Sequence, residues 1–126
     1  MAIFDEDILI IGAGLSGISA ACHLKKECPN RKFTILERRT TIGGTWDLFR
    51  YPGIRSDSDM FSFGFKFKPW KNAHFFSQGN DIRSYVHEAA EEAGLGPVLL
   101  EESVTLRLQM RAAVKGLLFV FGCGDA

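Results

Sequence analysis

One glycine-rich segment near the N-terminus has the residue types that could bind a diphosphate. It reads GAGLSG from Gly12 to Gly17, with Leu15 and Ser16 before the last glycine, and it directly follows an apolar run. In the spacing GxGxxG the first glycine permits a tight turn, Gly14 lets the backbone approach a phosphate without a Cβ in the way, and the third permits close helix packing. A helix that begins here presents free N–H groups and about half a positive charge, which favour an anion. The segment therefore predicts a diphosphate site.

Glu37 is a second candidate ligand-binding residue, at a spacing from the glycine segment that suits a dinucleotide. It stands twenty residues after Gly17, at the end of another apolar run. A carboxylate at this place can accept hydrogen bonds from both ribose hydroxyls of an adenosine, and it disfavours a 2′-phosphate. The two features together predict a dinucleotide, FAD or NAD. The alternative is purely structural, a glycine-rich turn followed by an exposed glutamate at a strand end.

The apolar pattern indicates the elements that would position these residues. Asp7–Ile11 is a continuous β-branched run, typical of a strand buried in a parallel sheet. From Leu15 to about Cys28 apolar and small residues return at helical spacing, and Phe33–Glu37 reads as a second strand. Strand, glycine turn, helix and strand form a βαβ unit. We therefore expect an α/β fold of the Rossmann-like FAD/NAD(P)-binding class, with a parallel sheet.

Residues 40–80 predict a long, ordered loop region, because they hold many turn formers and aromatic residues without a sustained period. A helix follows, since apolar residues from Ile82 to Ala93 recur at helical spacing. We expect Asn80 or Asp81 to cap this helix and Gly94 to end it.

Within that loop region, the row from Phe61 to Trp70 alternates aromatic residues with small or basic ones. Its simplest interpretations are an apolar wall near a cofactor or an ordinary core strand. The alternative is a strand that stacks RNA bases, because single-stranded RNA favours aromatic platforms beside cations. The partner motif of such a strand is missing, so we expect no nucleic acid ligand.

Composition narrows the remaining classes of function. The 126 residues include 15 basic and 15 acidic side chains, so bulk charge favours neither nucleic acid nor anionic membranes. Residues 31–72 hold nine Lys or Arg and four acids, which suits a small anionic ligand or simply a solvated surface. Three cysteines without a CxxC pair and three scattered histidines predict no metal site. An acidic N-terminus and the lack of an apolar run of about 20 residues predict a cytoplasmic protein without a membrane span.

A second glycine segment decides between the two dinucleotides. Ile42 to Trp46 read IGGTW and lead into DLFRYPGIRSD, which ends at Asp57. These strings resemble the FAD-binding half of class B flavoprotein monooxygenases, which comprise Baeyer-Villiger and flavin-containing monooxygenases. The longer string IGGTWDLFRYPGIRSDSDM is most similar to the Baeyer-Villiger subgroup that includes the ethionamide-activating monooxygenases. The resemblance spans about residues 5–93.

The resemblance implies roles for the matching residues. Gly12, Gly14 and Gly17, with Leu15 and Ser16, would hold the FAD diphosphate. Glu37 would bind the adenosine ribose, and Arg38 would flank the adenine.

The second segment would serve the flavin end of the cofactor. The residues that would run along the ribityl chain are Gly43, Gly44, Thr45 and Trp46. A Trp after a turn is also an ordinary core anchor. Asp57 would lie near the flavin as a catalytic acid that positions an arginine supplied from elsewhere, unless it merely pairs with Arg55 at the surface.

For complete family members, the resemblance implies oxidation of a small organic substrate by oxygen, with FAD as cofactor and NADPH as co-substrate. A flavin peroxide converts ketones or aldehydes to esters, or oxygenates a soft heteroatom. This chain has one GxGxxG and lacks the family's fingerprint histidine segment, so no second Rossmann domain for NADPH is visible. We therefore expect the FAD-binding part of such a monooxygenase, inactive alone. The alternatives are the NAD-binding domain of a dehydrogenase, in which IGGTW has no role, and a remnant that binds nothing.

The stretch after Gly94 does not resemble the family. Val104–Leu108 alternates like a strand, and Gly116–Gly122 reads as a buried strand without a closing helix. We expect residues 1–94 to be the FAD-binding Rossmann-like portion and residues 95–126 to be an atypical tail, from truncation or a frameshift. An alternative is that Asp125, after an apolar run, would reach the ribityl hydroxyls as an acid does in other FAD proteins.

Overall fold

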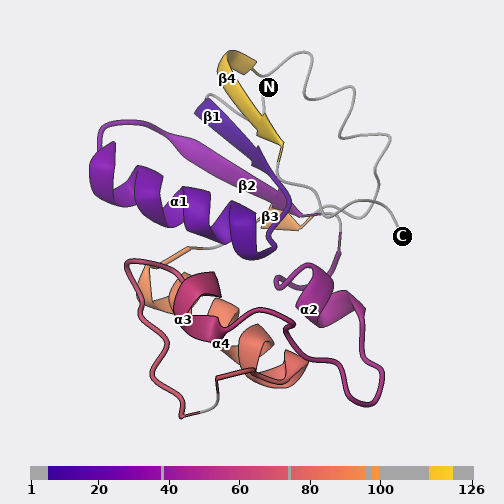
Figure 1. The fold of residues 1–126 in the computed structure, drawn as a ribbon. Helices are drawn as coiled ribbons and strands as arrows, with labels where there is room; N and C mark the ends of the chain where they lie inside the picture. The colour runs from indigo at the N-terminus through magenta and orange to yellow at the C-terminus, as the bar shows by residue number, and fades with distance from the viewer. Residues whose placement is uncertain (1–5, 38, 74, 96–97, 100–113, 121–126) are drawn as a thin grey trace.

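The computed structural model describes residues 6–37, 39–73, 75–95, 98–99 and 114–120. These residues contain a single parallel sheet in the order β3-β2-β1-β4, made of β1 (Glu6–Ile11), β2 (Phe33–Glu37), β3 (Val98–Leu99) and β4 (Val114–Val120). Helix α1 (Leu15–Glu27) runs between this sheet and the helices α3 (Met60–Phe63) and α4 (Gly79–Glu92), and α2 (Thr45–Leu48) contacts α4 (Figure 1). The expected α/β fold with a parallel sheet is confirmed.

Strands β1 and β2 and helix α1 form the βαβ unit that the apolar pattern predicts. Ile8 pairs with Phe33, and the two strands run in the same direction. Strand β1 starts one residue before the expected Asp7, and α1 ends at Glu27, one residue before Cys28. The first glycine turn therefore follows the carboxyl end of β1, which is the edge where parallel α/β sheets bind ligands.

Helix α4 is the amphipathic helix expected from the spacing of its apolar residues, but its start was predicted wrongly. It begins at Gly79 after Gln78, rather than behind a cap at Asn80 or Asp81. Gly79 N donates a hydrogen bond to Ile54 O at 2.9 Å, and a Cβ on Gly79 would lie 2.9 Å from the Ile54 Cγ2. The contact between Gly79 and the distant residue Ile54 sets the start of the helix. Asn80 and Asp81 therefore lie inside the helix and do not cap it. At the other end Gly94 has φ +66° and ends the helix as expected.

Residues 40–80 contain two four-residue helices, α2 and α3, and otherwise turns and bends. The expected loop region is right in outline, whereas the core strand considered for Phe61–Trp70 is wrong. Asp59 caps α3 by accepting a hydrogen bond from Ser62 N at 2.8 Å. Gly64 N then bonds to Met60 O at 2.9 Å, and the chain turns after it. An extended strand would break both bonds.

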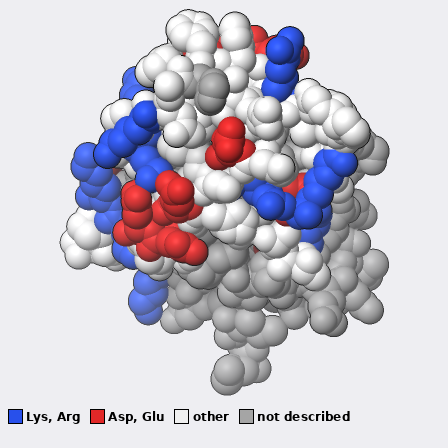
Figure 2. Space-filling view, turned by 90° about the horizontal axis from the view of Figure 1, so that it is seen from below, with Lys and Arg blue, Asp and Glu red and all other residues white. Residues whose placement is uncertain are grey.

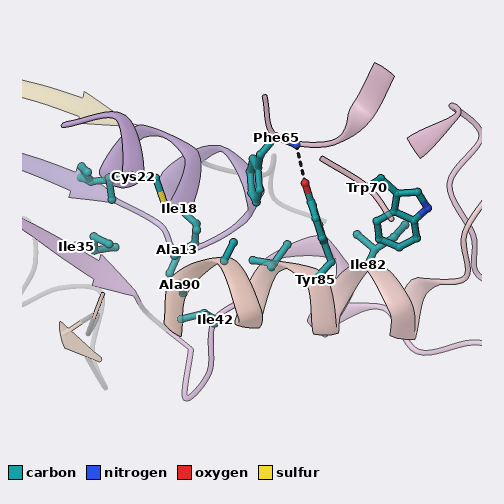
Figure 3. Packing of buried hydrophobic residues seen from close by; sticks show 14 of the residues in the cluster. Ala13, Ile18, Cys22, Ile35, Ile42, Phe65, Trp70, Ile82, Tyr85 and Ala90 are labelled. Carbon is teal, nitrogen blue, oxygen red and sulfur yellow. Dashed lines mark hydrogen bonds between the residues drawn. The ribbon is translucent and has the colours of Figure 1, made fainter. Parts of the chain in front are cut away.

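Tyr85 on α4 holds the folded-back aromatic row in place. Its hydroxyl accepts a hydrogen bond from Phe65 N at 2.8 Å (Figure 3) and donates one to Lys68 O. The rings of Phe65 and Trp70 each lie 5.2 Å from the Tyr85 ring, one stacked and one edge-on. Burial raises the pKa of Tyr85, and this outweighs the opposite influences of the Phe65 N–H and of Lys68.

The hydrophobic core joins the sheet, α1, α4 and the loop region (Figure 3). Its buried members are Ile10, Ala13, Ile18, Ala21, Cys22, Ile35, Ile42, Met60, Phe65, Trp70, Ile82, Tyr85, Val86, Ala89 and Ala90. Burial raises the pKa of the Cys22 thiol more than the nearby Lys25 lowers it. The core therefore fixes α4 and the loop region against the βαβ unit.

Two strands come from the stretch after Gly94. The strand expected at residues 116–122 is β4, which pairs in parallel with β1 through contacts such as Ile10 with Phe119. Strand β3 was not predicted, and it pairs with β2 at Leu36 and Glu37. The strand expected at 104–108, and Asp125, lie outside the described residues. The division of the chain after residue 94 stays a prediction.

Candidate functional site

The first glycine turn leaves the N-terminus of α1 open. Gly12 has φ +96° and donates a backbone hydrogen bond to Leu36 O at 2.7 Å, which ties the turn to β2. A Cβ on Gly17 would lie 2.0 Å from Gly12 O, so the third glycine is required by packing. Gly14 is the N-cap, and no side chain caps the first-turn N–H groups, which include those of Leu15 and Ser16.

Gly14 differs from the other two glycines of this turn. Its φ is −80°, which any residue adopts. The nearest atom to a Cβ on Gly14 would be Gly44 Cα at 3.5 Å, an ordinary van der Waals distance. Neither its backbone conformation nor its packing therefore requires glycine, and a Cβ on Gly14 would fit against Gly44 between the two glycine turns.

Glu37 lies against the first turn as the sequence predicted, but in a buried position. Its side chain is 7% exposed, so the alternative of an exposed strand-end glutamate is wrong. Its Oε2 accepts a hydrogen bond from Ala13 N at 2.7 Å, and its Oε1 accepts one from Arg39 N at 2.8 Å. A carboxylate offers about four lone-pair positions, so about two remain for other donors. Glu37 can therefore hold the turn and still bind a diol.

The second glycine turn touches the first, although about thirty residues separate them in the sequence. Gly43 and Gly44 have φ of +119° and +56°, which favours glycine at both positions. Gly43 N donates to Ala13 O at 2.9 Å, and a Cβ on Gly44 would lie 2.9 Å from Gly14 Cα. The fold thus brings together the two motifs that the sequence assigned to opposite ends of one cofactor.

Thr45 and Trp46 begin α2, directly after the second turn. The Trp46 ring is partly buried and lies edge-on to Phe63 on α3, with centroids 6.2 Å apart. Trp46 therefore serves in part as a core anchor, which is one of the two roles that the sequence analysis allowed.

Asp57 is not joined to this arrangement by any hydrogen bond or ion pair among the described residues. Its side chain is exposed, and the surface pair with Arg55 considered above does not form in the described part of the chain. The buried Ser56 holds the local turn, because its Oγ donates to Ser58 O at 2.8 Å. Arg38 lies outside the described residues.

Asp47 is a buried acid that the sequence analysis did not single out. Its side chain is only 3% exposed. Its carboxylate lies 2.7 Å from Arg39 Nη2, 2.6 Å from Arg50 Nη2 and 3.7 Å from Arg83 Nη1. The only signal in the sequence was one acid within a basic stretch. Arg50 follows Asp47 by three residues, but Arg39 and Arg83 are brought in by the fold, so spacing alone could not reveal the whole cluster.

Two open hollows are lined by residues outside the glycine turns. One, of about 590 Å³, borders the Asp47 cluster and α4, and another, of about 610 Å³, lies beside Lys25, Arg31 and Leu95. No three His, Cys, Asp or Glu side chains of the described residues converge as a metal site requires. In the same part of the chain, every helix is too short or too polar to cross a membrane.

Residues 10–89, which contain both glycine turns and Glu37, match the family of NAD(P)-binding Rossmann-like domains. The chain belongs to this family. The Rossmann-like class expected from the βαβ pattern is thereby confirmed.

Curated relatives of this Rossmann-like chain include the FAD-containing monooxygenase EthA of Mycolicibacterium smegmatis and the probable FAD-binding monooxygenase AlmA of Acinetobacter baylyi. Each is 60% identical over 89 residues, which are 71% of this chain and 18% of the relative. The resemblance to class B monooxygenases inferred from the IGGTW and YPGIRSD strings is confirmed. The chain spans less than a fifth of the length of these relatives.

Solved structures agree with this Rossmann-like assignment. An FAD-bound form of OTEMO is 30% identical with a TM-score of 0.64, and the match covers 72% of this chain and 18% of OTEMO. An oxidised steroid monooxygenase bound to NADP has a TM-score of 0.65 at 24% identity over 71% of this chain and 18% of its own, and it supports the fold alone.

Proposed function

We propose that this chain is the FAD-binding part of an NADPH-dependent flavoprotein monooxygenase. The observation that carries the proposal is the direct contact between the two glycine turns, with Gly43 N bonded to Ala13 O. A ligand that contacts both turns can place a diphosphate at the first turn and a second half at the other. FAD has this form, and the names of the relatives agree with it.

The residues of the first turn would bind the diphosphate of FAD. The uncapped N–H groups after Gly14 supply donors and a partial positive charge, and the absence of a Cβ on Gly14 allows close approach. Glu37 would accept hydrogen bonds from the ribose hydroxyls with its remaining lone pairs. Arg38 would flank the adenine.

The residues of the second turn would hold the flavin half. Gly43 and Gly44 would follow the ribityl chain, and Thr45 and Trp46 would lead toward the isoalloxazine. Asp57, whose exposed carboxylate is free of ion pairs within the described residues, would position an arginine supplied by another part of a complete enzyme.

When bound, FAD supplies the redox chemistry, and the protein binds, orients and shields it. The substrates would be oxygen and a small organic molecule with a carbonyl group or a soft heteroatom. Residues 1–94 would form the FAD-binding part and residues 95–126 a distinct tail. This part alone would not turn over, because the described residues offer one dinucleotide site and the reaction needs a second for NADPH.

The test is direct binding by the purified chain. We expect yellow protein that releases flavin on denaturation, and by equilibrium dialysis a Kd for FAD at least about tenfold below that for NAD, because only FAD engages both turns. Tighter binding of NAD would select the dehydrogenase alternative. Binding of neither dinucleotide would select the alternative of a remnant that binds nothing.

A further inference from the structure

Arg39 connects Glu37 with the second glycine turn and with Asp47. Its backbone N donates to Glu37 Oε1 at 2.8 Å. Its guanidinium divides between two acceptors, with Nη1 donating to Gly44 O at 3.2 Å and Nη2 donating to Asp47 Oδ2 at 2.7 Å. Arg39 thus joins the Glu37 carboxylate, the second glycine turn and the first turn of α2.

We propose that Asp47 is a positioning residue that, through Arg39, holds the second glycine turn in the conformation that accepts the flavin half of FAD. The inference rests on the function proposed above. Asp47 itself would not touch the cofactor.

The second turn needs such a tether because of its own composition. Two successive glycines have the largest conformational freedom of any residue pair, so their ordered state carries a high entropic cost. Gly43 N reaches Ala13 O, and the Gly44 carbonyl accepts hydrogen bonds from Asp47 N and Leu48 N as well as from the Arg39 side chain. The two backbone bonds lie within the turn and α2, whereas the Arg39 bond ties this unit to the segment after β2. Without the Arg39 bond the unit would have more freedom to move, and part of the binding free energy of FAD would go into ordering it.

Asp47 is suited to fix the direction of the Arg39 fork. A planar guanidinium with a short bond to a buried carboxylate has little freedom to rotate. Arg50 Nη2 lies 2.6 Å from the other carboxylate oxygen, Oδ1, and Arg83 Nη1 lies 3.7 Å from it, so the carboxylate is itself held from a second side. Without the carboxylate, three guanidinium groups would remain close together, and their repulsion would move Arg39 away from Gly44.

The Asp47 cluster contacts the second glycine turn, whereas other residues hold the first glycine turn. Ala13 N bonds to Glu37, and Gly12 N bonds to Leu36 O, so the first turn is held without Asp47. Loss of Asp47 should therefore weaken ligands that reach the second turn and spare ligands that occupy only the first.

The experiment compares FAD with ADP, which lacks the flavin half, in the parent chain and in the variants Asp47→Asn and Arg39→Gln. Lys68→Gln is the control, because it removes ion pairs to Glu92 and Glu88 far from the glycine turns. Each Kd would be measured by fluorescence or calorimetric titration, and circular dichroism would check that each variant is folded.

We expect the Kd for FAD to rise about tenfold or more in both variants while the Kd for ADP changes less than about twofold. Lys68→Gln should leave both constants unchanged. If Asp47→Asn does not fold, the test rests on Arg39→Gln, because Arg39 is less buried than Asp47. An unchanged ratio of the two constants in the folded variants overturns the inference while leaving the proposed function intact. A parent chain that binds no FAD overturns both.

Discussion

At the scale of single residues, the three glycines of the first turn are needed for different reasons. Gly12 needs its positive φ, and Gly17 needs the space that a Cβ would take from Gly12 O. Gly14 needs neither, so the proposed diphosphate at the turn is the reason we assign to a glycine there. Substitutions at Gly12 and Gly17 should therefore affect stability, whereas a substitution at Gly14 should affect binding.

The first prediction concerns Gly17→Ala. Its Cβ would lie 2.0 Å from a backbone oxygen that cannot rotate away, so we expect a loss of about 3 kcal/mol or more in the free energy of unfolding. Gly53→Ala is the control, because Gly53 has φ +82° but no atom within 4 Å of a Cβ, which predicts only about 1 kcal/mol. Urea unfolding measures both. Equal losses would mean that close packing at Gly17 is not the cause.

The second prediction concerns Glu37→Gln. Both Glu37 oxygens accept backbone N–H groups, and an amide has one oxygen only, so one of the donors Ala13 N and Arg39 N would face an NH2 group. We expect a loss of about 1–3 kcal/mol in stability even without cofactor. Glu27→Gln, at the exposed end of α1, should cost under about 0.5 kcal/mol. A Glu37→Gln protein as stable as its parent in urea would show that these bonds contribute nothing.

At the scale of elements, α4 holds the loop region through Tyr85. Its hydroxyl satisfies a buried backbone N–H of Phe65 and bonds to Lys68 O, so two turns depend on one side chain. Burial raises the pKa of Tyr85 above the ordinary value of 10.0, so the folded state keeps the proton to a higher pH than the unfolded state. Stability contributed by Tyr85 is therefore fully present below pH 10 and is lost as the pH rises through the folded pKa.

The third prediction follows for Tyr85→Phe. Near pH 8 the variant should be less stable by about 1–3 kcal/mol, because Phe65 N loses its acceptor. From about pH 9 to pH 11 its stability should fall less steeply than that of the parent, since the phenyl ring has no proton to lose. Denaturant unfolding at several pH values measures both effects. Parallel pH profiles would contradict the placement of the Tyr85 hydroxyl in the core.

How far the sequence predicts these elements depends on the distance over which each is determined. The β1-α1-β2 unit and α4 were predictable, because period and capping are local properties of ten to fifteen residues. The start of α4 was not, because it is set by Gly79 against Ile54, and neither were the four-residue helices α2 and α3. Glycines and Glu37 were found by their spacing, whereas Asp47 was missed because two of its arginine partners, Arg39 and Arg83, are brought in by the fold.

At the scale of the whole molecule, one face carries large apolar side chains in contact with water. Phe61, Phe75 and Phe76 are 61%, 56% and 52% exposed, and their rings form a chain of contacts at 5.7 and 5.4 Å. The side of the molecule that carries α3 and α4 shows acidic and basic side chains next to one another, in groups divided by uncharged surface (Figure 2). A contiguous aromatic patch of this kind predicts a surface that binds apolar molecules.

The fourth prediction tests this patch. Replacement of Phe61, Phe75 and Phe76 by serine should lower the fluorescence of a bound apolar dye such as ANS by about twofold or more. Tyr51→Ser is the control, since Tyr51 is 59% exposed and belongs to none of these ring contacts. Stability should change little because none of the three rings belongs to the core. Dye binding that is equal in both variants would show that the patch is not a binding surface.

The measurement that tests the central claim most directly is calorimetric titration of FAD into the parent chain and into Gly14→Ala, with the melting temperature of each. Because Gly14 has an ordinary φ and its Cβ would make only van der Waals contact with Gly44, the variant should melt close to the parent temperature. Because the diphosphate would occupy the space of that Cβ, its Kd for FAD should rise about tenfold or more. Equal affinity in the two proteins, or no binding by the parent, would contradict the account.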